Sequence, residues 1–211
     1  MIALWFIVVV LLGYLIGSIP FGVIVGRLTR GIDVRDYGSG SMGMTNVIRT
    51  VGARAGALVF VADMAKGAAA VALAWLIFAS DMVAWGQVAG GAAAVIGHSW
   101  PVYVRFRGGR GVTTGFGALL VMSWPVGLIS FAVFLAVVGL FRYMSLGSML
   151  AGLAMLVSMI PFVVFDLKPF EFEYLVFGLI IVPLILFRHR GNIRRLLAGT
   201  EPKIGQRTET R

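Results

Sequence analysis

Cysteine is absent from this 211-residue chain, which excludes disulfides and cysteine metal or redox sites and leaves the redox state of its compartment open. Acidic residues are scarce, with 9 Asp and Glu against 18 Lys and Arg, and only 13% of the residues are charged. Hydrophobic residues make up 59%, and the mean hydropathy is +0.95. A soluble globular domain is therefore excluded, and the composition predicts a protein embedded in a bilayer.

The net charge of +9 is spread between the apolar runs and does not form one soluble basic face. Nucleic acid is thus not an expected partner, whereas membrane lipid and anionic substrates are. The first apolar run has no basic segment ahead of it and is long enough to cross the hydrocarbon core, so we expect a retained transmembrane helix and no cleaved signal. We expect Pro20 to kink this helix.

Seven apolar runs predict an all-α integral membrane protein with seven transmembrane helices, some of them short. The runs are Ile2–Val25, Ala53–Ala79, Met82–Gly97, Val112–Met122, Pro125–Phe141, Leu146–Phe165 and Phe170–Phe187. The fourth run spans the core only if it is tilted, buried in protein or placed where the bilayer is thin. We separate it from the fifth at Ser123-Trp124-Pro125, because proline disfavours helix at the residue before it.

The distribution of charge supports seven crossings. Every Lys and Arg except Lys66 and Lys168 then falls on one side, in loops at about 26–52, 98–111 and 142–145 and in the tail at 188–211. The positive-inside rule places this side in the cytoplasm and the N-terminus outside. Residues 1–211 form one domain, with no internal repeat.

The first cytoplasmic loop contains "GSGSMGMTN", residues 38–46. We expect a helix to start near Thr45 or Asn46 and to carry Arg49 in its first turn. Glycine backbone N–H groups, a helix N-terminus and an arginine together form an anion site. The candidate residues are Gly38, Ser39, Gly40, Ser41, Thr45, Asn46 and Arg49. A flexible surface loop with a helix cap is the alternative.

Two further polar segments lie on the same predicted side. "GHSWPVYVRFRGGRGVTTG" places Gly108, Gly109, Arg110 and Gly111 at a helix start, without the spacing of a Walker loop. "HRGNIRRLLAGTE" places His189 and Asn192 on one helical face, and an unperturbed histidine pKa of about 6.5 suits a proton shuttle. The alternative for both is a basic segment that contacts lipid headgroups.

Together the three segments resemble the signature motifs of the bacterial acyl-phosphate:glycerol-3-phosphate acyltransferases, the PlsY family. "GYLIGSIPFG" at 13–22, "DMAKG" at 63–67 and "SLGS" at 145–148 extend the resemblance along the chain. It implies a seven-helix enzyme of the bacterial inner membrane with its active site facing the cytoplasm. The implied reaction transfers a fatty acyl group from acyl phosphate to the 1-hydroxyl of sn-glycerol 3-phosphate, giving lysophosphatidate and inorganic phosphate.

The resemblance also implies residue roles. Ser39 and Arg49 match an essential pair, and His189 and Asn192 match functional residues of the third motif. Gly108, Gly109 and Gly111 match a glycerol-phosphate loop, and Ser145 and Ser148 match binding positions, while Glu201 is expected to tie the tail to the site. We expect a monomer without cofactor or metal.

Three positions depart from the family pattern. Ser41 stands where asparagine is usual, Met44 where alanine is usual and Arg110 where lysine is usual. Arg110 keeps the charge, so a mechanism that needs a neutral amine at this position is disfavoured.

The sequence leaves the proton acceptor open between His189 and an oxygen of the donor phosphate, with a preference for the phosphate. A covalent role for Ser39 is disfavoured because no His-Asp partner is visible. Neither histidine has an aspartate five positions later, which counts against an acyl-CoA donor. An anion transporter and a lipid-binding scaffold are rivals, but the polar motifs cluster on one membrane side without repeats.

Asp63 and Lys66 fall three positions apart within the second long apolar run. They are either a functional pair or a mutually neutralising structural pair. His98 is interpreted as a packed residue at the membrane interface.

Overall fold

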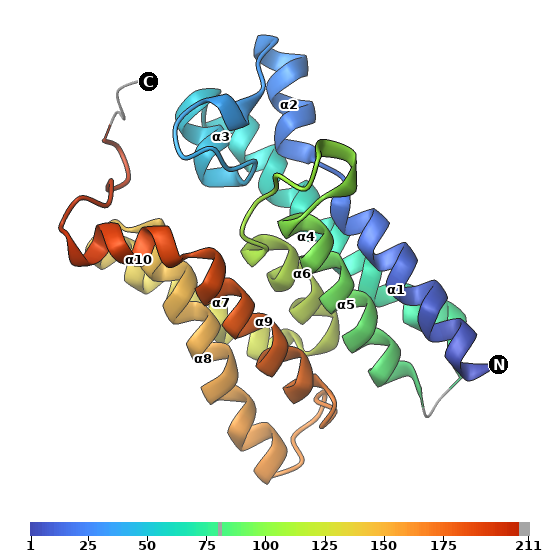
Figure 1. The fold of residues 1–211 in the computed structure, drawn as a ribbon. Helices are drawn as coiled ribbons and strands as arrows, with labels where there is room; N and C mark the ends of the chain where they lie inside the picture. The colour runs from blue at the N-terminus through green and yellow to red at the C-terminus, as the bar shows by residue number, and fades with distance from the viewer. Residues whose placement is uncertain (80–81, 207–211) are drawn as a thin grey trace.

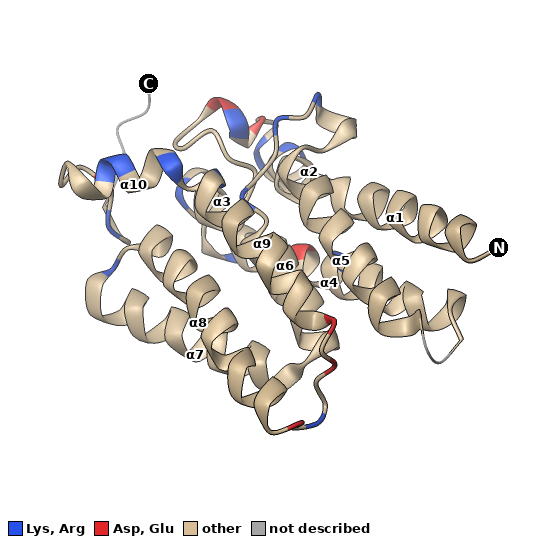
Figure 2. Ribbon diagram, turned by 60° about the horizontal axis from the view of Figure 1, so that its bottom comes forward, with Lys and Arg blue, Asp and Glu red and all other residues tan. Residues whose placement is uncertain are grey.

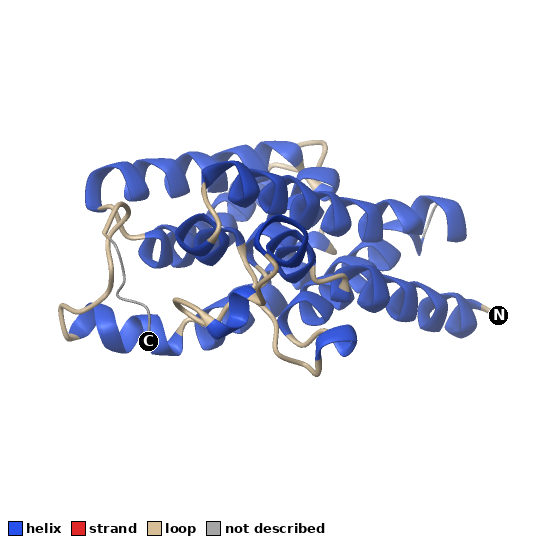
Figure 3. Cartoon of the chain, turned by 90° about the horizontal axis from the view of Figure 1, so that it is seen from above, coloured by secondary structure: helices blue, strands red, loops and turns tan. Residues whose placement is uncertain are grey.

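The computed structural model describes residues 1–79 and 82–206, and within these residues every regular element is a helix (Figures 1 and 3). The α-helices are α1 (Ile2–Ser18), α2 (Phe21–Arg30), α3 (Met44–Thr50), α4 (Ala53–Ile77), α5 (Val83–Ser99), α6 (Val112–Met122), α7 (Trp124–Phe141), α8 (Met144–Val164), α9 (Tyr174–Arg188) and α10 (Arg190–Leu197). Short 3₁₀ turns lie at η1 (Val34–Asp36) and η3 (Val102–Val104). The predicted all-α fold is confirmed.

The helices support a multi-pass membrane protein. Among the described residues, α4, α7, α8 and the stretch Ile2–Arg30 are long and apolar enough to cross a bilayer, and α9 with α10 counts as a fifth span if this pair, bent by 56°, is one span. All seven predicted apolar runs are helical, but the count of seven crossings stays a prediction.

The first apolar run does not form one helix with a kink, as we expected, but two helices. Ile19 has φ −57° and ψ 117°, which is extended backbone, and Pro20 follows it. The proline ring disfavours helical backbone at the preceding residue, and here α1 ends and α2 starts anew at Phe21.

The predicted break between the fourth and fifth runs is confirmed. Ser123 has φ −152° and ψ 93°, and it ends α6 and precedes α7. Pro125 lies in the first turn of α7, where its missing N–H leaves no intrahelical bond unmade.

Small residues let the helix backbones approach closely. A Cβ at Gly13 of α1 would lie 2.7 Å from the carbonyl oxygen of Gly90 of α5, and Gly67 of α4 likewise touches the backbone of Thr114 of α6. Such contacts suit helix packing in lipid, where association depends on close van der Waals contact.

The three motif segments lie at one end of the bundle, together with α2, α3 and α10 (Figure 1). Figure 2 shows Lys and Arg gathered at this end, while the α8–α9 connection carries charges at the other. Beneath the first motif, Val23, Val34, Met42, Val47 and Val59 form a small core of their own.

Candidate active site

The first motif folds around Asn46, which is buried in α3. Its Nδ2 atom donates to the carbonyl oxygens of Val34 and Ser41 at 2.7 and 2.8 Å, and its Oδ1 atom accepts from the N–H of Ser39 at 2.9 Å. Gly38 has φ +58°, and a Cβ there would collide with Asn46. This network gives the loop a defined shape.

Arg49 lies in the last turn of α3 and not in the first, because the helix already begins at Met44. Its Nη2 atom donates to the carbonyl oxygen of Pro202 at 3.4 Å. Burial lowers the pKa of Arg49 from its ordinary value, although the nearby Glu201 carboxylate opposes that shift.

The second motif is held from two sides. His98 lies in the last turn of α5, inside the segment predicted as loop, and its carbonyl oxygen accepts from the Gly109 N–H at 3.0 Å. Arg188 at the end of α9 donates to the Gly109 carbonyl oxygen from Nη2 at 2.7 Å and from Nε at 3.1 Å. Its guanidinium also lies 5.1 Å from the Trp100 ring centroid, within cation–π range.

Arg35 connects the first motif segment to the second. Its guanidinium donates to the Asp33 carboxylate at 2.9 and 2.6 Å and to the Val104 carbonyl oxygen at 2.8 Å. The hydrogen bond from Arg35 holds the pKa of Asp33 below its ordinary value. Sequence reasoning counted Arg35 only as a basic loop residue.

Glu201 is the centre of the third segment. Its Oε1 atom accepts from Ser145 Oγ and from Asn192 Nδ2, each at 2.6 Å, and its Oε2 atom accepts from Arg195 Nε at 2.8 Å. Burial alone would raise the pKa of Glu201, but these three donors outweigh it and hold the pKa below the ordinary value. The expected tie between tail and site is therefore made by this carboxylate.

His189 lies between α9 and α10 and is buried. Its Nδ1 atom is 2.8 Å from the Ile185 carbonyl oxygen, which only accepts, so Nδ1 carries the proton and Nε2 is the acceptor. Burial, with the charge of Arg110, lowers the pKa of His189 to about 4. The imidazole is therefore neutral at neutral pH.

A cavity of about 570 Å³ lies between the three segments. Its lining residues are Arg35, Asp36, Tyr37, Gly38, Ser39, Gly40, Thr45, Arg49, Arg110, Met144, Ser145, Asn192, Arg195, Thr200, Glu201 and Pro202. Four arginines face two carboxylates, so the cavity favours anions. Burial lowers the pKa of Arg110 to about 10, which still leaves a cation at neutral pH.

A smaller pocket of about 70 Å³ shares lining residues with this cavity. Thr45 and Arg110 line both spaces, and His189 lines the smaller one. Val112 and Ser148 in turn line both the smaller pocket and an apolar pocket of about 60 Å³. The three spaces are therefore neighbours that share walls.

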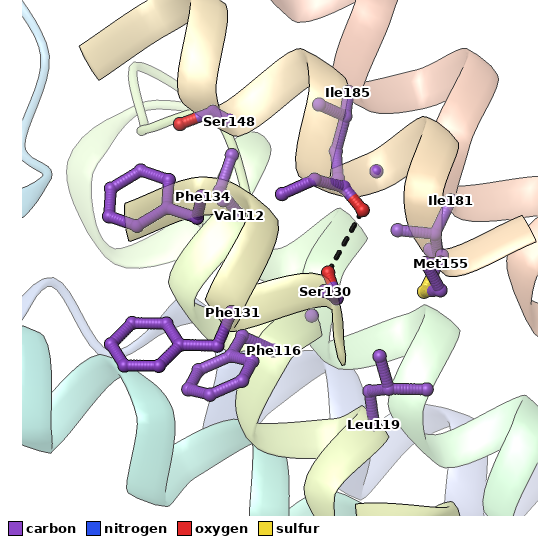
Figure 4. A pocket seen from close by; sticks show the side chains of 13 residues that line it. Val112, Phe116, Leu119, Ser130, Phe131, Phe134, Ser148, Met155, Ile181 and Ile185 are labelled. Carbon is purple, nitrogen blue, oxygen red and sulfur yellow. Dashed lines mark hydrogen bonds between the residues drawn. The ribbon is translucent and has the colours of Figure 1, made fainter. Parts of the chain in front are cut away.

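Figure 4 shows the apolar pocket between α6, α7, α8 and α9. Phe116 and Phe131 stack at 5.0 Å between ring centroids and Phe134 lies 6.0 Å from Phe131, so one wall is aromatic. Ser130 and Ser148 are the polar exceptions, and their hydroxyls are occupied by donating to the carbonyl oxygens of Ala151 and Met144, each at 2.9 Å. Such a lining suits a hydrocarbon chain.

The structure brings most of the predicted site residues together. Gly38, Ser39, Gly40, Thr45, Arg49, Arg110, Ser145 and Asn192 line the cavity, and Gly111, Ser148 and His189 line the smaller pocket. Asn46, Gly108 and Gly109 line neither space: Asn46 hydrogen-bonds within the first loop, and the two glycines hydrogen-bond to residues of α5 and α9. The predicted set did not include Arg35, Arg188 and Arg195, because spacing alone does not separate them from the other basic residues.

A helical membrane protein with a cationic cavity next to an apolar pocket has the features of a protein that handles an anionic amphiphile. Residues 7–199 match the family model described as glycerol-3-phosphate acyltransferase, and the chain belongs to this family. The family inferred from the motifs is confirmed.

Relatives and solved structures agree with this membership. The chain is 47% identical over 196 residues to the glycerol-3-phosphate acyltransferase of Parasynechococcus marenigrum (strain WH8102), covering 93% of this chain and 88% of the relative. It is 43% identical over 200 residues to that of Prochlorococcus marinus (strain NATL1A), covering 95% and 98%.

Two crystal structures of PlsY (YgiH), an integral membrane glycerol 3-phosphate acyltransferase, share the fold at 37% identity. The glycerol 3-phosphate form has a TM-score of 0.84 and matches 95% of this chain and 96% of that chain. The lysophosphatidic acid form has a TM-score of 0.82 and matches 95% of each.

Proposed function

We propose that this protein transfers a fatty acyl group to the 1-hydroxyl of sn-glycerol 3-phosphate, giving lysophosphatidate for phospholipid synthesis. The acyl donor is an acyl phosphate, so inorganic phosphate is released. The observation that carries this proposal is that three spaces adjoin one another. The cavity has four arginines, the smaller pocket is lined by His189, and the third pocket is apolar. Two phosphates and one hydrocarbon chain need such an arrangement.

The cavity binds the two phosphate groups. Arg49 and Arg110 reach it from α3 and from the start of α6, and each can bind phosphate oxygens in a fork. Ser39 and Thr45 add hydroxyl donors. Asn192 has one N–H occupied by Glu201, which leaves the other to orient the donor or the tetrahedral oxyanion.

The other predicted residues act by holding the loops around the cavity in their conformation. Asn46 fixes the backbone of the first motif, while Gly108 and Gly109 let the second motif fold against α5. Ser145 positions Glu201, and Ser148 lines both the smaller pocket and the apolar pocket.

The reaction joins the 1-hydroxyl oxygen to the acyl carbonyl carbon and breaks the bond between that carbon and the phosphate oxygen. The donor is an activated mixed anhydride, so positioning and charge stabilisation suffice without a covalent enzyme intermediate. The lowering of the His189 pKa to about 4 makes its imidazole a weak base and favours an oxygen of the departing phosphate as the proton acceptor. The proton of the 1-hydroxyl therefore goes to the phosphate. Nε2 of His189 acts only as a hydrogen-bond acceptor.

The protein lies in the bacterial inner membrane as a monomer with seven crossings, an external N-terminus and the motif segments in the cytoplasm. The clustering of Lys and Arg at the cavity end supports this orientation. The α6 helix is shorter than a lipid-facing span requires, and burial of Thr114, Ala118 and Leu119 against other helices supports it as an internal crossing.

Purified protein supplied with glycerol 3-phosphate and either palmitoyl phosphate or palmitoyl-CoA tests the proposal. Lysophosphatidate and inorganic phosphate are expected from palmitoyl phosphate, and their absence with folded protein would reject it. Product from the CoA ester alone would reject the donor. Arg49→Ala should lose about 100-fold or more in turnover, as for a group that stabilises charge in the transition state. Arg30→Ala, at an exposed arginine outside the cavity, is the matched control.

A further inference from the structure

Three ionisable side chains are buried together inside the helix bundle. Asp63 and Lys66 of α4 and His98 of α5 are 1%, 3% and 3% exposed. Ionisable groups are costly at such a place in a membrane protein, and they are kept where they pair with each other and serve a function. The reaction proposed above gives none of the three a role.

Lys66 has two partners that account for its own burial. Its Nζ atom lies 2.7 Å from Asp63 Oδ1 and donates to the carbonyl oxygen of Ile19 at 2.9 Å. Ile19 is the residue that follows the end of α1 and precedes Pro20. Lys66 therefore stabilises the break between α1 and α2. Mutual neutralisation with Asp63 would explain this half of the cluster, but it leaves His98 unexplained.

His98 faces the same oxygen of Asp63. Its Nδ1 atom lies 3.4 Å from Asp63 Oδ1 and makes no hydrogen bond to any of the described residues. A carboxylate oxygen only accepts, so this neighbour favours the imidazole form with the proton on Nδ1. The carboxylate therefore favours this orientation of the ring by electrostatic attraction at 3.4 Å.

The other edge of the ring supports the second motif. A Cβ at Gly109 would collide with His98 Nε2, and one at Gly108 would collide with the His98 carbonyl oxygen. The Gly109 N–H donates to that carbonyl oxygen, and Arg188 holds the Gly109 carbonyl oxygen from the opposite side. The glycine pair is thus clamped between His98 and Arg188, directly before Arg110 enters the cavity.

We propose that Asp63 and His98 are positioning residues that fix the Gly108-Gly109-Arg110 loop for binding the phosphate of glycerol 3-phosphate. Asp63 orients His98, and His98 supports the loop through its ring edge and its carbonyl oxygen. This inference rests on the proposed function. It predicts that changes at Asp63 and His98, which line the smaller pocket with Arg110 and His189 but not the large cavity, weaken acceptor binding.

The first test separates positioning from simple neutralisation. Asp63→Leu combined with Lys66→Met removes both charges and the oxygen that faces His98, so no unpaired ion is left buried. We expect this double variant to raise the KM for glycerol 3-phosphate by about tenfold to a hundredfold, as loop misplacement does, with a much smaller change in the KM for palmitoyl phosphate. A folded double variant with a wild-type KM for glycerol 3-phosphate would overturn the proposal.

His98→Asn is the second variant and decides the matter if the double variant does not fold. It keeps a donor near the place of Nδ1 but lacks the edge that carries Nε2, so the same selective rise in KM is expected. The change at Asp63 and Lys66 should add little in the His98→Asn background, because it acts through His98. An unchanged KM in folded His98→Asn, or additive effects of the changes, would overturn the proposal.

Tyr174→Phe is the matched control, because it removes a buried hydroxyl that donates to Gln87 of α5 at 2.6 Å, away from the second motif. We expect a lower melting temperature with both KM values unchanged. Wild-type protein is assayed alongside. If it forms no lysophosphatidate, the proposed function fails, and this failure is distinct from a wild-type KM in the variants.

Discussion

At the scale of single residues, His189 illustrates how burial changes chemistry. One ring nitrogen faces the Ile185 carbonyl oxygen, and the pKa is lowered to about 4. The chain has only 2 histidines, so histidine labelled with ¹³C gives two ring signals. We expect the signal that disappears in His189→Ala to keep the shift of a neutral ring down to about pH 5. Titration near the ordinary value of about 6.5 would contradict this expectation.

Glu201 predicts a pH dependence of stability. Its folded pKa lies below the ordinary value of 4.5, so its contribution is fully present above about pH 4.5 and is lost as the pH falls through the folded pKa. Glu201→Gln should cost about 1–3 kcal/mol at pH 7, and its melting temperature should fall less steeply with acid than that of wild type. Thermal melts from pH 7 to pH 3 measure both.

The exposed Glu171 in the α8–α9 connection provides the control for this experiment. Glu171→Gln should reproduce the acid dependence of wild type. If the melting temperatures of wild type and Glu201→Gln fell equally with acid, the hydrogen bonds from the three donors would not depend on the charge of Glu201.

At the scale of the elements, the apolar pocket between α6, α7, α8 and α9 predicts that a side chain placed in it selectively weakens binding of the acyl donor. A Cβ at Gly152 has only an ordinary contact, 3.8 Å from Val182, so Gly152→Leu can place its side chain in the pocket. Displacing two methylenes costs about 1.6 kcal/mol, or about fifteenfold in affinity. We expect the KM for palmitoyl phosphate to rise by roughly this factor.

Gly139→Leu on α7 is the control, because a Cβ there meets no atom within 4 Å and the position lies outside the pocket. Its KM for palmitoyl phosphate should equal that of wild type. A shorter donor, octanoyl phosphate, should be affected less than palmitoyl phosphate in Gly152→Leu. Equal effects on the two donors would show that the acyl chain binds outside this pocket.

Sequence reasoning located the elements better than the contacts between them. Hydropathy was sufficient for the apolar runs, and Pro125 marked the break between α6 and α7 because its effect is local. The break at Pro20 was predicted only as a kink, since its partner Lys66 comes from a helix 47 positions away in the chain. The motifs named most residues of the cavity, whereas Arg35 and Arg188 act through long-range bonds to backbone carbonyls that no spacing predicts.

At the scale of the whole molecule, the lack of cysteine makes the topology testable. Single cysteines in place of Phe172, in the α8–α9 connection, and Leu197, at the end of α10, are exposed at opposite ends of the bundle. In intact spheroplasts a membrane-impermeant maleimide should label Phe172→Cys at once and Leu197→Cys only after permeabilisation. The reverse pattern would contradict the external N-terminus, and equal labelling of both would contradict crossing by α9.

The bonds of Glu201 also impose an order in time. Ser145 and Asn192 are made before Glu201, and both donate to its carboxylate. The wall of the cavity that these residues form cannot close before Glu201 has left the ribosome and reached the start of α8. Because chains begin to fold while they are made, the preceding helices can insert first, and the finished substrate cavity forms only after Glu201 has been made.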